Sequence, residues 1–232
     1  MRIDQPVVLG RLVKRYKRFL TDVEMDDGSI LTAHCPNTGS MKGCLEPGAR
    51  VVLRDSEDPK RKLRHTFQTI EVGGTWVNVD TGLPNALAAE AVAAGLIEEL
   101  DGYASLRREV KYGTNSRIDL LLEDDERGRA YVEVKNTTLA TGDLALFPDA
   151  VTTRGRKHLE ELAGVVADGD RGVMLFCVSR DDVRRFAPAD EIDPDYGRTL
   201  REVAEAGVEL LAYSTRVTPT SFELGRRLPV EL

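Results

Sequence analysis

The sequence predicts a protein of mixed α/β (α+β) class with two domains: an all-β domain over residues 1–82, and a domain over residues 83–232 in which a mixed sheet is flanked by helices. Two observations lead to this prediction. Short apolar segments separated by turn residues fill the N-terminal part, which is typical of antiparallel strands. Beyond residue 83, strand-like and helix-like segments alternate, which indicates a sheet with helices on its faces.

In the N-terminal part, the strand-like segments are short and follow one another closely. The expected strands are Val7–Leu12, Arg18–Met25, Ile30–Cys35, Ala49–Arg54, Phe67–Val72 and Thr75–Val79. Asp27-Gly28 lies between the second and third segments and is a typical hairpin turn. So many short strands in a segment of this length predict a small barrel, of which the OB-type barrel is a common example.

In the C-terminal part, a run rich in helix formers comes first, "LPNALAAEAVAAGLIEEL" at Leu83–Leu100. We expect Asn85 to be its N-cap and Gly102 to follow its end. The expected elements that follow are strands at Ser105–Lys111, Arg117–Leu122 and Ala130–Asn136, a helix at Thr153–Ala167, a strand at Gly172–Ser179, a helix at Pro194–Ala206 and a strand at Val208–Tyr213.

The composition limits the cellular setting. Three cysteines, Cys35, Cys44 and Cys177, are an odd number in a chain of 232 residues. They predict a reducing, cytoplasmic compartment and no disulfide framework. No apolar run has the length of a membrane span, and the N-terminus lacks the apolar region of a secretory signal, so we expect no membrane partner. The net charge of −7 argues mildly against nucleic-acid binding, although basic residues cluster locally.

The hairpin "RIDLLLEDDERGRAYVEVKN" at Arg117–Asn136 contains the main candidate site. A turn centred on Glu126 places Asp119 opposite Glu133. Period-two alternation then predicts an apolar face with Ile118, Leu120, Leu122, Val132 and Val134, and a second face with Arg117, Asp119, Tyr131, Glu133 and Lys135. Two carboxylates on directly opposed residues repel each other unless a cation joins them.

These residue types suit a hard divalent cation. Mg²⁺ is bound in proteins by one or two carboxylates and several waters, so Asp119 and Glu133 are predicted metal ligands for Mg²⁺ or Mn²⁺, with the carbonyl of Val134 as a further ligand. Lys135 is on the same side as Glu133 and is suited to hold a water molecule or to stabilise charge at a phosphate. The alternative is an ordinary salt-bridged, solvated hairpin face, which is the commoner meaning of such a short pattern.

The order of elements favours the metal site. Asp-x(13)-Glu-Val-Lys in a hairpin, preceded by a helix and followed by a helix and a buried strand, resembles the PD-(D/E)xK nuclease core. That resemblance implies a further acid from the first helix, for which Glu90 is the candidate; Glu109, on the strand before Asp119, is the alternative. The proline of the family pattern is absent, because Ile118 precedes Asp119.

Four longer motifs extend the resemblance over nearly the whole chain. They are "HCPNTGSMKGCLEPG" (His34–Gly48), "SRIDLLL" (Ser116–Leu122), "YVEVKNTTL" (Tyr131–Leu139) and "FPDAVTTRGRKHLEEL" (Phe147–Leu162). Together they resemble the sugar fermentation stimulation protein (SfsA) family. The resemblance implies an N-terminal OB-fold domain, a C-terminal PD-(D/E)xK nuclease-like domain, DNA binding, and a link to the regulation of sugar-utilisation genes.

Basic residues supply candidate contacts to phosphate. Arg154 and His158 share one face of the expected helix at Thr153–Ala167, near its start, together with Lys157. Arg154 is suited to a bidentate contact with the scissile phosphate. The cluster "RLVKRYKRF", which interleaves aromatic with basic residues, is suited to nucleic acid, including single strands. Its candidate DNA contacts are Arg11, Lys14, Arg15, Lys17 and Arg18. The alternative for both groups is a solvated basic surface.

The loop Asn37–Gly43 has two open interpretations. Its backbone donors, its hydroxyl groups and Lys42 are suited to a phosphate, but a structural turn that joins the two domains is an equal alternative. His34, Cys35 and Cys44 have no standard zinc spacing. Asp149 is expected to have a structural role, such as a turn cap, and the alternative is an outer-shell acid of the metal site.

Two functions therefore follow from the sequence. The first is a DNA-binding protein with a Mg²⁺-dependent nuclease site formed by Asp119, Glu133, Lys135 and Glu90. The second is a DNA-binding regulator of sugar-metabolism genes that keeps a nuclease fold without the activity. An RNA substrate at the same site is a further alternative to DNA.

Overall fold

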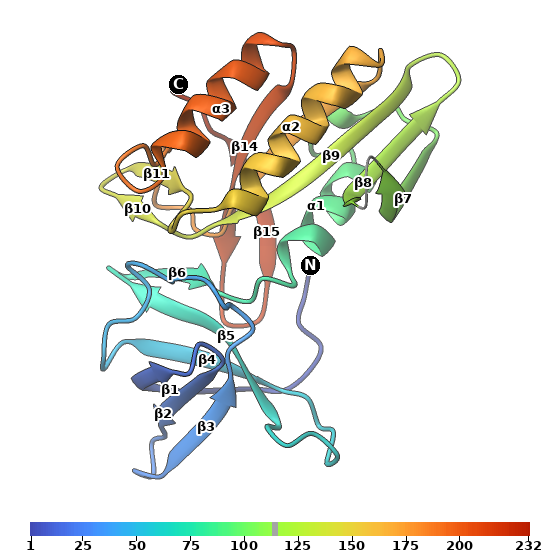
Figure 1. The fold of residues 1–232 in the computed structure, drawn as a ribbon. Helices are drawn as coiled ribbons and strands as arrows, with labels where there is room; N and C mark the ends of the chain where they lie inside the picture. Colours follow the sequence, from blue (N-terminus) through green and yellow to red (C-terminus); the bar gives the residue numbers. More distant parts are fainter. Residues whose placement is uncertain (113–115) are drawn as a thin grey trace.

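The computed structural model describes residues 1–112 and 116–232, and it separates into a β part at the N-terminus and a part with helices and strands at the C-terminus (Figure 1). The N-terminal strands are β1 (Val7–Tyr16), β2 (Leu20–Glu24), β3 (Ile30–His34), β4 (Arg50–Asp55), β5 (His65–Val72) and β6 (Thr75–Asn78). The predicted strands are all present, with ends that differ by a few residues.

The N-terminal sheet has the order β3-β2-β1-β4-β5-β6, and an additional pairing of β3 with β5 closes its first five strands into a ring. The interior of the ring is apolar and includes Leu12, Val23, Val51, Phe67 and Ile70, which are nearly or fully buried. Cys35 and Cys44 belong to this same core, where burial raises the pKa of both thiols. This environment is that of apolar side chains rather than of metal ligands.

The C-terminal sheet has six strands in the order β15-β14-β12-β9-β8-β7. Their bounds are β7 (Ser105–Tyr112), β8 (Ser116–Asp124), β9 (Gly128–Thr137), β12 (Arg171–Val178), β14 (Glu209–Val217) and β15 (Phe222–Arg227). β12 is parallel to both β9 and β14, whereas the other pairs are antiparallel. The predicted mixed sheet is confirmed, and the antiparallel unit of β7, β8 and β9 is followed by a helix and a buried strand as expected.

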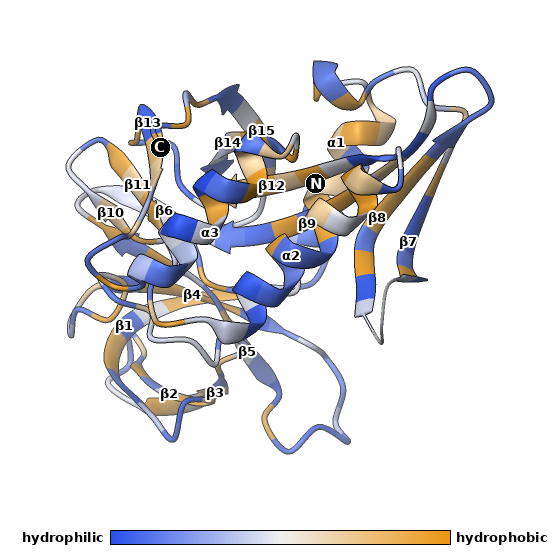
Figure 2. Ribbon diagram, turned by 45° about the horizontal axis from the view of Figure 1, so that its top comes forward, coloured by the Kyte–Doolittle hydropathy of each residue, from blue (hydrophilic) through white to orange (hydrophobic). Residues whose placement is uncertain are grey.

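Helices cover both faces of this sheet. Helix α1 (Pro84–Ala93) packs on one face in a core that includes Leu120, Val132 and Leu175. Helices α2 (Thr153–Ala167) and α3 (Pro194–Glu205) pack on the other face, in a core that includes Leu159, Phe176 and other apolar residues. In Figure 2 hydrophobic and hydrophilic residues are interspersed along the strands of this sheet, and α2 and α3 also carry both kinds.

The first helix is shorter than predicted. Its N-cap is Leu83, so Asn85 lies inside the first turn and is not the N-cap. The helix ends at Ala93, Gly95 has a positive φ of 66°, and the rest of the predicted helix contains the separate 3₁₀ turn Glu98–Leu100. A glycine in this conformation ends a helix at little steric cost, and this explains the early end.

The sequence patterns missed several short elements. β10 (Ala140–Thr141), β11 (Leu144–Phe147) and β13 (Arg185–Pro188) form a small separate sheet, and β15 pairs with β14 at the sheet edge. Residues 1–3, assigned by the prediction to the N-terminal domain, instead lie against the C-terminal part. The N–H of Ile3 donates to the carbonyl of Thr220, and the N–H of Phe222 donates to the carbonyl of Met1.

The two parts of the chain are joined at the loop Asn37–Gly43. Asp149 accepts hydrogen bonds from Oγ of Ser40 (2.8 Å) and from the N–H of Met41 (2.9 Å). This contact confirms the structural role expected for Asp149. Because a carboxylate of the other domain already uses these donors, the loop serves as the interdomain turn. Throughout the described ranges, no helix is both long and apolar enough to cross a membrane.

Candidate metal and nucleic-acid site

The register of the β8–β9 hairpin is the predicted one from the turn as far as Leu120–Val132, but the predicted pairs Asp119–Glu133 and Ile118–Val134 do not form. Leu120 pairs with Val132 and Leu122 pairs with Ala130. Beyond the Leu120–Val132 pair, the N–H of Val134 donates to Oδ2 of Asp119 (2.7 Å). The side chain of Asp119 therefore receives a bond that a regular ladder would give to a backbone carbonyl. The two strands separate at this point, and Asp119 occupies the gap between them.

The predicted apolar face of the hairpin is wrong at Ile118. Ile118 is buried with Leu159 and Phe176 on the α2 side, not with Leu120 on the α1 side. The regular alternation breaks at Asp119, which stands in register between the pairs Arg108–Leu120 and Val110–Ile118 of strands β7 and β8. The residue of β7 opposite Asp119 is Glu109, whose φ of 54° is unusual for a residue other than glycine.

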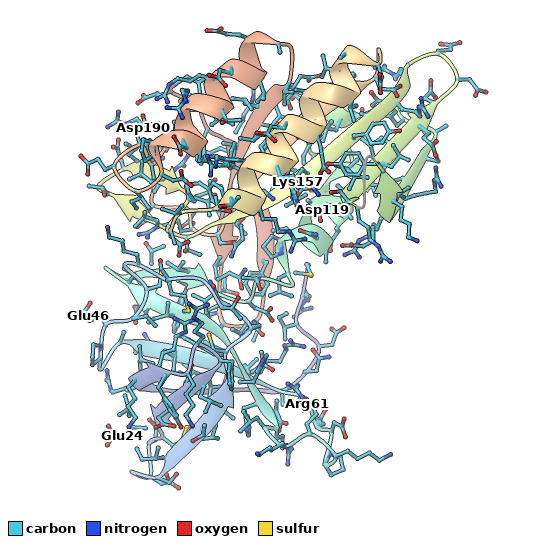
Figure 3. All side chains as sticks on the ribbon, viewed as in Figure 1. Glu24, Glu46, Arg61, Asp119, Lys157 and Asp190 are labelled. Carbon is cyan, nitrogen blue, oxygen red and sulfur yellow. The ribbon has the colours of Figure 1, made fainter. Side chains whose placement is uncertain are left out.

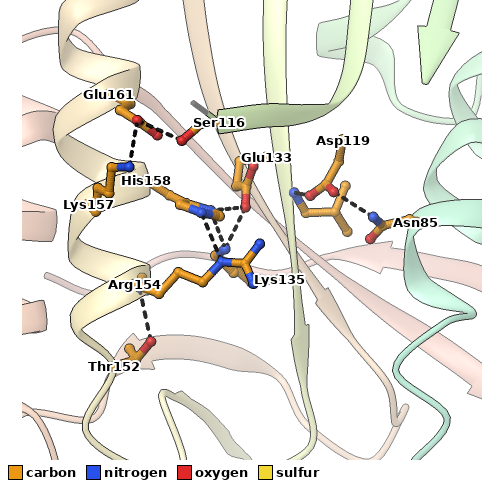
Figure 4. Close-up of polar contacts among 12 residues, drawn as sticks. Asn85, Ser116, Asp119, Glu133, Lys135, Thr152, Arg154, Lys157, His158 and Glu161 are labelled. Carbon is orange, nitrogen blue, oxygen red and sulfur yellow. Dashed lines mark hydrogen bonds and ion pairs between the residues drawn. The ribbon is translucent and has the colours of Figure 1, made fainter. Parts of the chain in front are cut away.

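Glu133 is buried on the α2 side of β9 and is held by two bases. Its side chain is 4% exposed, and its Oε1 accepts from Nζ of Lys135 (2.6 Å) and contacts Nδ1 of His158 (Figure 4). Burial acts to raise the pKa of Glu133, but the hydrogen bonds from His158 and Lys135 outweigh it and hold this pKa below its ordinary value. Glu133 is therefore an ionised carboxylate.

The side chain of His158 contacts Glu133 and is largely shielded from solvent. It is buried, its Nε2 lies 3.3 Å from Nε of Arg154, and its Nδ1 contacts both Oε1 of Glu133 and Nζ of Lys135 (3.1 Å). The prediction placed His158 among the phosphate contacts. His158 lines the same cavity, and its Nδ1 contacts Glu133, because the helix face that carries Arg154 and His158 turns toward β9.

Asp119 is held from the other side. Its Oδ1 accepts from Nδ2 of Asn85 (2.6 Å), on the first turn of α1, while its Oδ2 accepts from Val134. In Figure 4, Asp119 and Asn85 lie on one side of β9 and Glu133 and His158 on the other. Burial, and after it the charge of Glu133, raises the pKa of Asp119 to about 6. The two carboxylates thus approach β9 from opposite sides, so the prediction that Asp119 and Glu133 share one face of the hairpin is wrong.

Both carboxylates line one cavity of about 450 Å³, open to solvent beneath α2. The other lining residues are the acid Glu109, the hydroxyl of Ser116 and the bases Arg117, Arg154, Lys157 and His158. Figure 3 shows Asp119 and Lys157 close to each other at this place. Acidic residues with basic residues around them are suited to bind a metal ion and, next to it, a phosphate group.

The donor set fits a divalent ion that keeps water ligands. Oε2 of Glu133 is buried and has no partner within the described residues, which is costly for a charged oxygen. In residues 1–112 and 116–232 no three His, Cys, Asp or Glu side chains converge into a ready cage. Two carboxylates and a backbone carbonyl are a set that Mg²⁺ accepts, since it usually keeps several waters.

The structure places Glu109, and not Glu90, at this cavity. Glu90 is on the opposite, outward side of α1, where its carboxylate is 56% exposed and bonds the amino group of Met1 at 2.8 Å. The resemblance to the nuclease core suggested α1 as the source of the third acid. Here α1 instead directs Asn85 at Asp119, because Asn85 and Glu90 are five positions apart and point in different directions.

The basic residues of the N-terminal part have different environments. Arg15 donates to the carbonyls of Asn37 and Gly39 (2.7 and 3.0 Å) and so supports the interdomain loop. Arg11 donates to the carbonyl of Gly48, and Lys14 is 3.8 Å from Asp22. The side chains of Lys17, Arg18 and Lys42 are exposed to solvent.

Sequence reasoning missed three neighbours of the site. For Asn85, the sequence predicted only a role as the N-cap of the first helix. Tyr112 has a buried hydroxyl without a partner within the described residues, and burial, followed by the charges of Glu133 and Glu161, raises its pKa. Glu161 accepts from Oγ of Ser116 (2.7 Å) and lies 3.5 Å from Lys157. For Glu161, the sequence offered one indication: it lies four positions after Lys157 on α2, a spacing that brings two side chains together on one helix face.

Comparisons with known proteins agree with this architecture. A family model described as "SfsA N-terminal OB domain" matches residues 13–79, and one described as "Sugar fermentation stimulation protein RE domain" matches residues 82–221. Sugar fermentation stimulation protein homologues from Geobacter sulfurreducens and Pelobacter propionicus are 55% and 56% identical, over 99% and 98% of this chain and 98% of each relative.

A solved structure resembles the whole chain. The structure of Pyrococcus furiosus SfsA in complex with Ca²⁺ has a TM-score of 0.88 and 28% sequence identity, and the match covers 100% of both chains. The matches extend through both the N-terminal OB domain and the C-terminal domain that carries Asp119 and Glu133. The chain therefore belongs to the sugar fermentation stimulation protein (SfsA) family.

Proposed function

We propose that this protein binds DNA and hydrolyses its phosphodiester bonds with the help of a divalent metal ion, Mg²⁺ or Mn²⁺. One observation carries the proposal: Asp119 and the buried Glu133, whose Oε2 has no partner within the described residues, line the same cavity at the point where β8 and β9 separate. A structural salt-bridge cluster alone would not need a second carboxylate there, because Lys135 and His158 already bond Oε1 of Glu133.

Asp119, Glu133 and the carbonyl of Val134 would hold the ion, and Glu109 would contribute through a water molecule. The structure of a relative in complex with Ca²⁺, which is also a hard cation with oxygen ligands, supports this assignment. A bound divalent ion would lower the pKa of a water molecule and stabilise charge on the phosphate. His158 would keep Glu133 oriented through its Nδ1, as partners behind a ligand do in metal sites.

Lys135 would act at the attacking water. Its Nζ lies 2.6 Å from Glu133. Because the side chain of lysine is flexible, the ammonium group could contact a water molecule that lies between Lys135 and Glu133. An ammonium group at this place stabilises the charge that develops on the phosphate oxygens. Lys135 would not accept a proton while it is charged, so its role would be to position the water and to stabilise charge rather than to act as the base.

DNA would be held by phosphate contacts on both parts of the chain. Arg154, Lys157 and Arg117 line the cavity and would contact the phosphates next to the cleaved bond. The exposed Lys17, Arg18 and Lys42 would extend the contact along the strand. With a net charge of −7, attraction depends on these local groups, and binding should weaken steeply with salt.

The alternative is a DNA-binding regulator that keeps the fold without the activity. The raised pKa of Asp119 favours the enzyme, because a buried pair of carboxylates costs stability when no cation joins them. The experiment is to incubate labelled DNA, single-stranded and duplex, with the protein and Mg²⁺ or Mn²⁺, with an RNA strand as a third substrate.

The variants for this experiment are Asp119→Asn and Lys135→Ala, with Glu90→Gln as a control at an acid outside the cavity. Loss of cleavage in the first two, with DNA binding and the activity of Glu90→Gln retained, supports the enzyme. Binding by the wild-type protein without cleavage under either metal would leave the regulator. Cleavage of RNA alone would move the substrate assignment from DNA to RNA.

A further inference from the structure

A second cavity lies where the two parts of the chain meet. It has a volume of about 180 Å³, equal to roughly six water molecules at about 30 Å³ each. Its wall includes Asn37 and Thr81 from the N-terminal side and Asn136, Phe147 and Asp149 from the C-terminal side. Thr81 is exposed, so the cavity opens to solvent at this residue.

The wall combines the aromatic ring of Phe147 and the apolar side chains of Leu139 and Leu146 with hydrogen-bonding groups. Oδ1 of Asn136 accepts from Ser179 (2.5 Å) and Oδ1 of Asn37 accepts from the N–H of Gly39 (2.8 Å). Within the described residues, Nδ2 of neither amide has a partner. Asp149 uses its Oδ2 for the interdomain loop, and its Oδ1 has no partner there. Two amide donors and a carboxylate acceptor therefore remain beside the ring of Phe147.

We propose that this cavity receives a single nucleobase that has left the stack of the bound nucleic acid. This inference rests on the proposed DNA binding. A nucleobase is a planar ring with donors and acceptors on its edge and a face that stacks on aromatic side chains, and it fits a small cavity with those features. A phosphate group would be repelled by Asp149, and an apolar ligand would leave the amides of Asn37 and Asn136 unpaired.

The position of the cavity supports the same occupant. Asn136 lies three residues after Glu133 on β9, so one strand contributes to both cavities. The segment after β11 runs from Phe147 and Asp149 into α2, which carries Arg154. A strand whose phosphate lies at Arg154 would bring a neighbouring nucleotide close to the second cavity.

An exposed apolar side chain lies in the segment of chain that runs from a residue of the second cavity to a residue of the first. Val151 is 69% exposed, and it lies two residues after Asp149 and three residues before Arg154. Proteins that unstack bases often insert an apolar side chain into the base stack. We expect the side chain of Val151 to fill the gap that the extruded base leaves in the stack. This contact would cover an apolar side chain that is otherwise exposed to solvent.

The test uses DNA with one 2-aminopurine placed at successive positions, because the fluorescence of this base rises when it leaves the stack. The full-length protein is added in EDTA so that no cleavage occurs. The variant Thr81→Phe fills the cavity from its exposed rim, and Asn136→Leu removes one donor. Thr220→Phe makes the same change at an exposed threonine outside the cavity wall and is the matched control.

We expect a several-fold rise in fluorescence at one position with the wild-type protein and with Thr220→Phe, and no rise with Thr81→Phe. The wild-type protein should also bind DNA with one unpaired base about ten-fold more tightly than fully paired DNA, because extrusion then costs less. Thr81→Phe and Asn136→Leu should reduce this preference, and thermal unfolding of each variant checks that it is folded.

Two results separate this inference from the proposed function. Cleavage of DNA with Mg²⁺, together with unchanged fluorescence at every position, would overturn the base-binding cavity and leave the nuclease in place. A rise in fluorescence that Thr81→Phe abolishes, without cleavage under Mg²⁺ or Mn²⁺, would support the cavity and overturn the nuclease. Equal fluorescence in the wild-type protein and Thr81→Phe would mean that the cavity is only a water-filled joint.

Discussion

Replacing Asp119 by Asn should stabilise the metal-free protein while removing its affinity for a divalent ion. Asp119 is largely buried, and its carboxylate faces the charge of Glu133 across β9. An Asn keeps an oxygen that can accept from the N–H of Val134, and Asn85 can rotate its amide to accept from the new NH₂ group. The substitution therefore removes one charge and keeps the hydrogen bonds.

The size of the effect follows from the pKa of Asp119, which is about 6 in the folded protein against the ordinary 3.8. At about 1.36 kcal/mol per pH unit, this difference corresponds to an upper limit of about 3 kcal/mol. The folded state binds the proton more tightly than the unfolded state, so this group lowers stability as the pH rises from about 4 to above 6. For a protein of this size, that limit corresponds to a melting temperature of the variant that is higher than that of the wild-type protein by roughly 6–12 °C.

The assay is thermal unfolding of the wild-type protein and Asp119→Asn between pH 4 and pH 8, in EDTA and then with Mg²⁺, Mn²⁺ or Ca²⁺. In EDTA the advantage of the variant should be small at pH 4 and largest above pH 7. With metal at a hundred times its dissociation constant, the wild-type protein should gain about 2.7 kcal/mol and the variant little. A variant that melts below the wild-type protein in EDTA at pH 8, or a difference that does not depend on pH, would refute the reasoning.

Three further predictions concern other parts of the chain. Glu109→Gln should lower Mg²⁺-dependent cleavage at least ten-fold while Glu90→Gln leaves it unchanged, because only Glu109 lines the cavity; equal losses in a cleavage assay would contradict this placement. Asp149→Ala should lower the free energy of unfolding by about 1–3 kcal/mol, since it leaves Ser40 and the N–H of Met41 without their acceptor; denaturant unfolding measures it, and an unchanged midpoint would contradict the interdomain role. Lys17→Ala combined with Arg18→Ala should weaken DNA binding and reduce the slope of log K against log salt by about 0.9 per lost phosphate contact; a slope equal to that of the wild-type protein would remove these residues from the interface.

The sequence by itself determined the order of the main elements and the register of the central hairpin. Strands were recognisable because the apolar positions of β8 and β9 alternate and because turn residues separate them. The turn at Glu126 fixed which residues of the hairpin face each other from the turn to the pair Leu120–Val132, beyond which the predicted pair Asp119–Glu133 does not form. Lys135 was placed correctly beside Glu133, since residues two apart on a strand share a side.

The tertiary structure alone decided which groups surround the carboxylates. The break in alternation at Asp119 sends Ile118 to the other face, and no local pattern announces it, because it depends on the neighbouring strand and on Glu109. The partners of the site, Asn85 and His158, lie 34 residues from Asp119 and 25 residues from Glu133 along the chain. Periodicity describes the face of one element, whereas such contacts arise only when helices pack on a sheet from both sides.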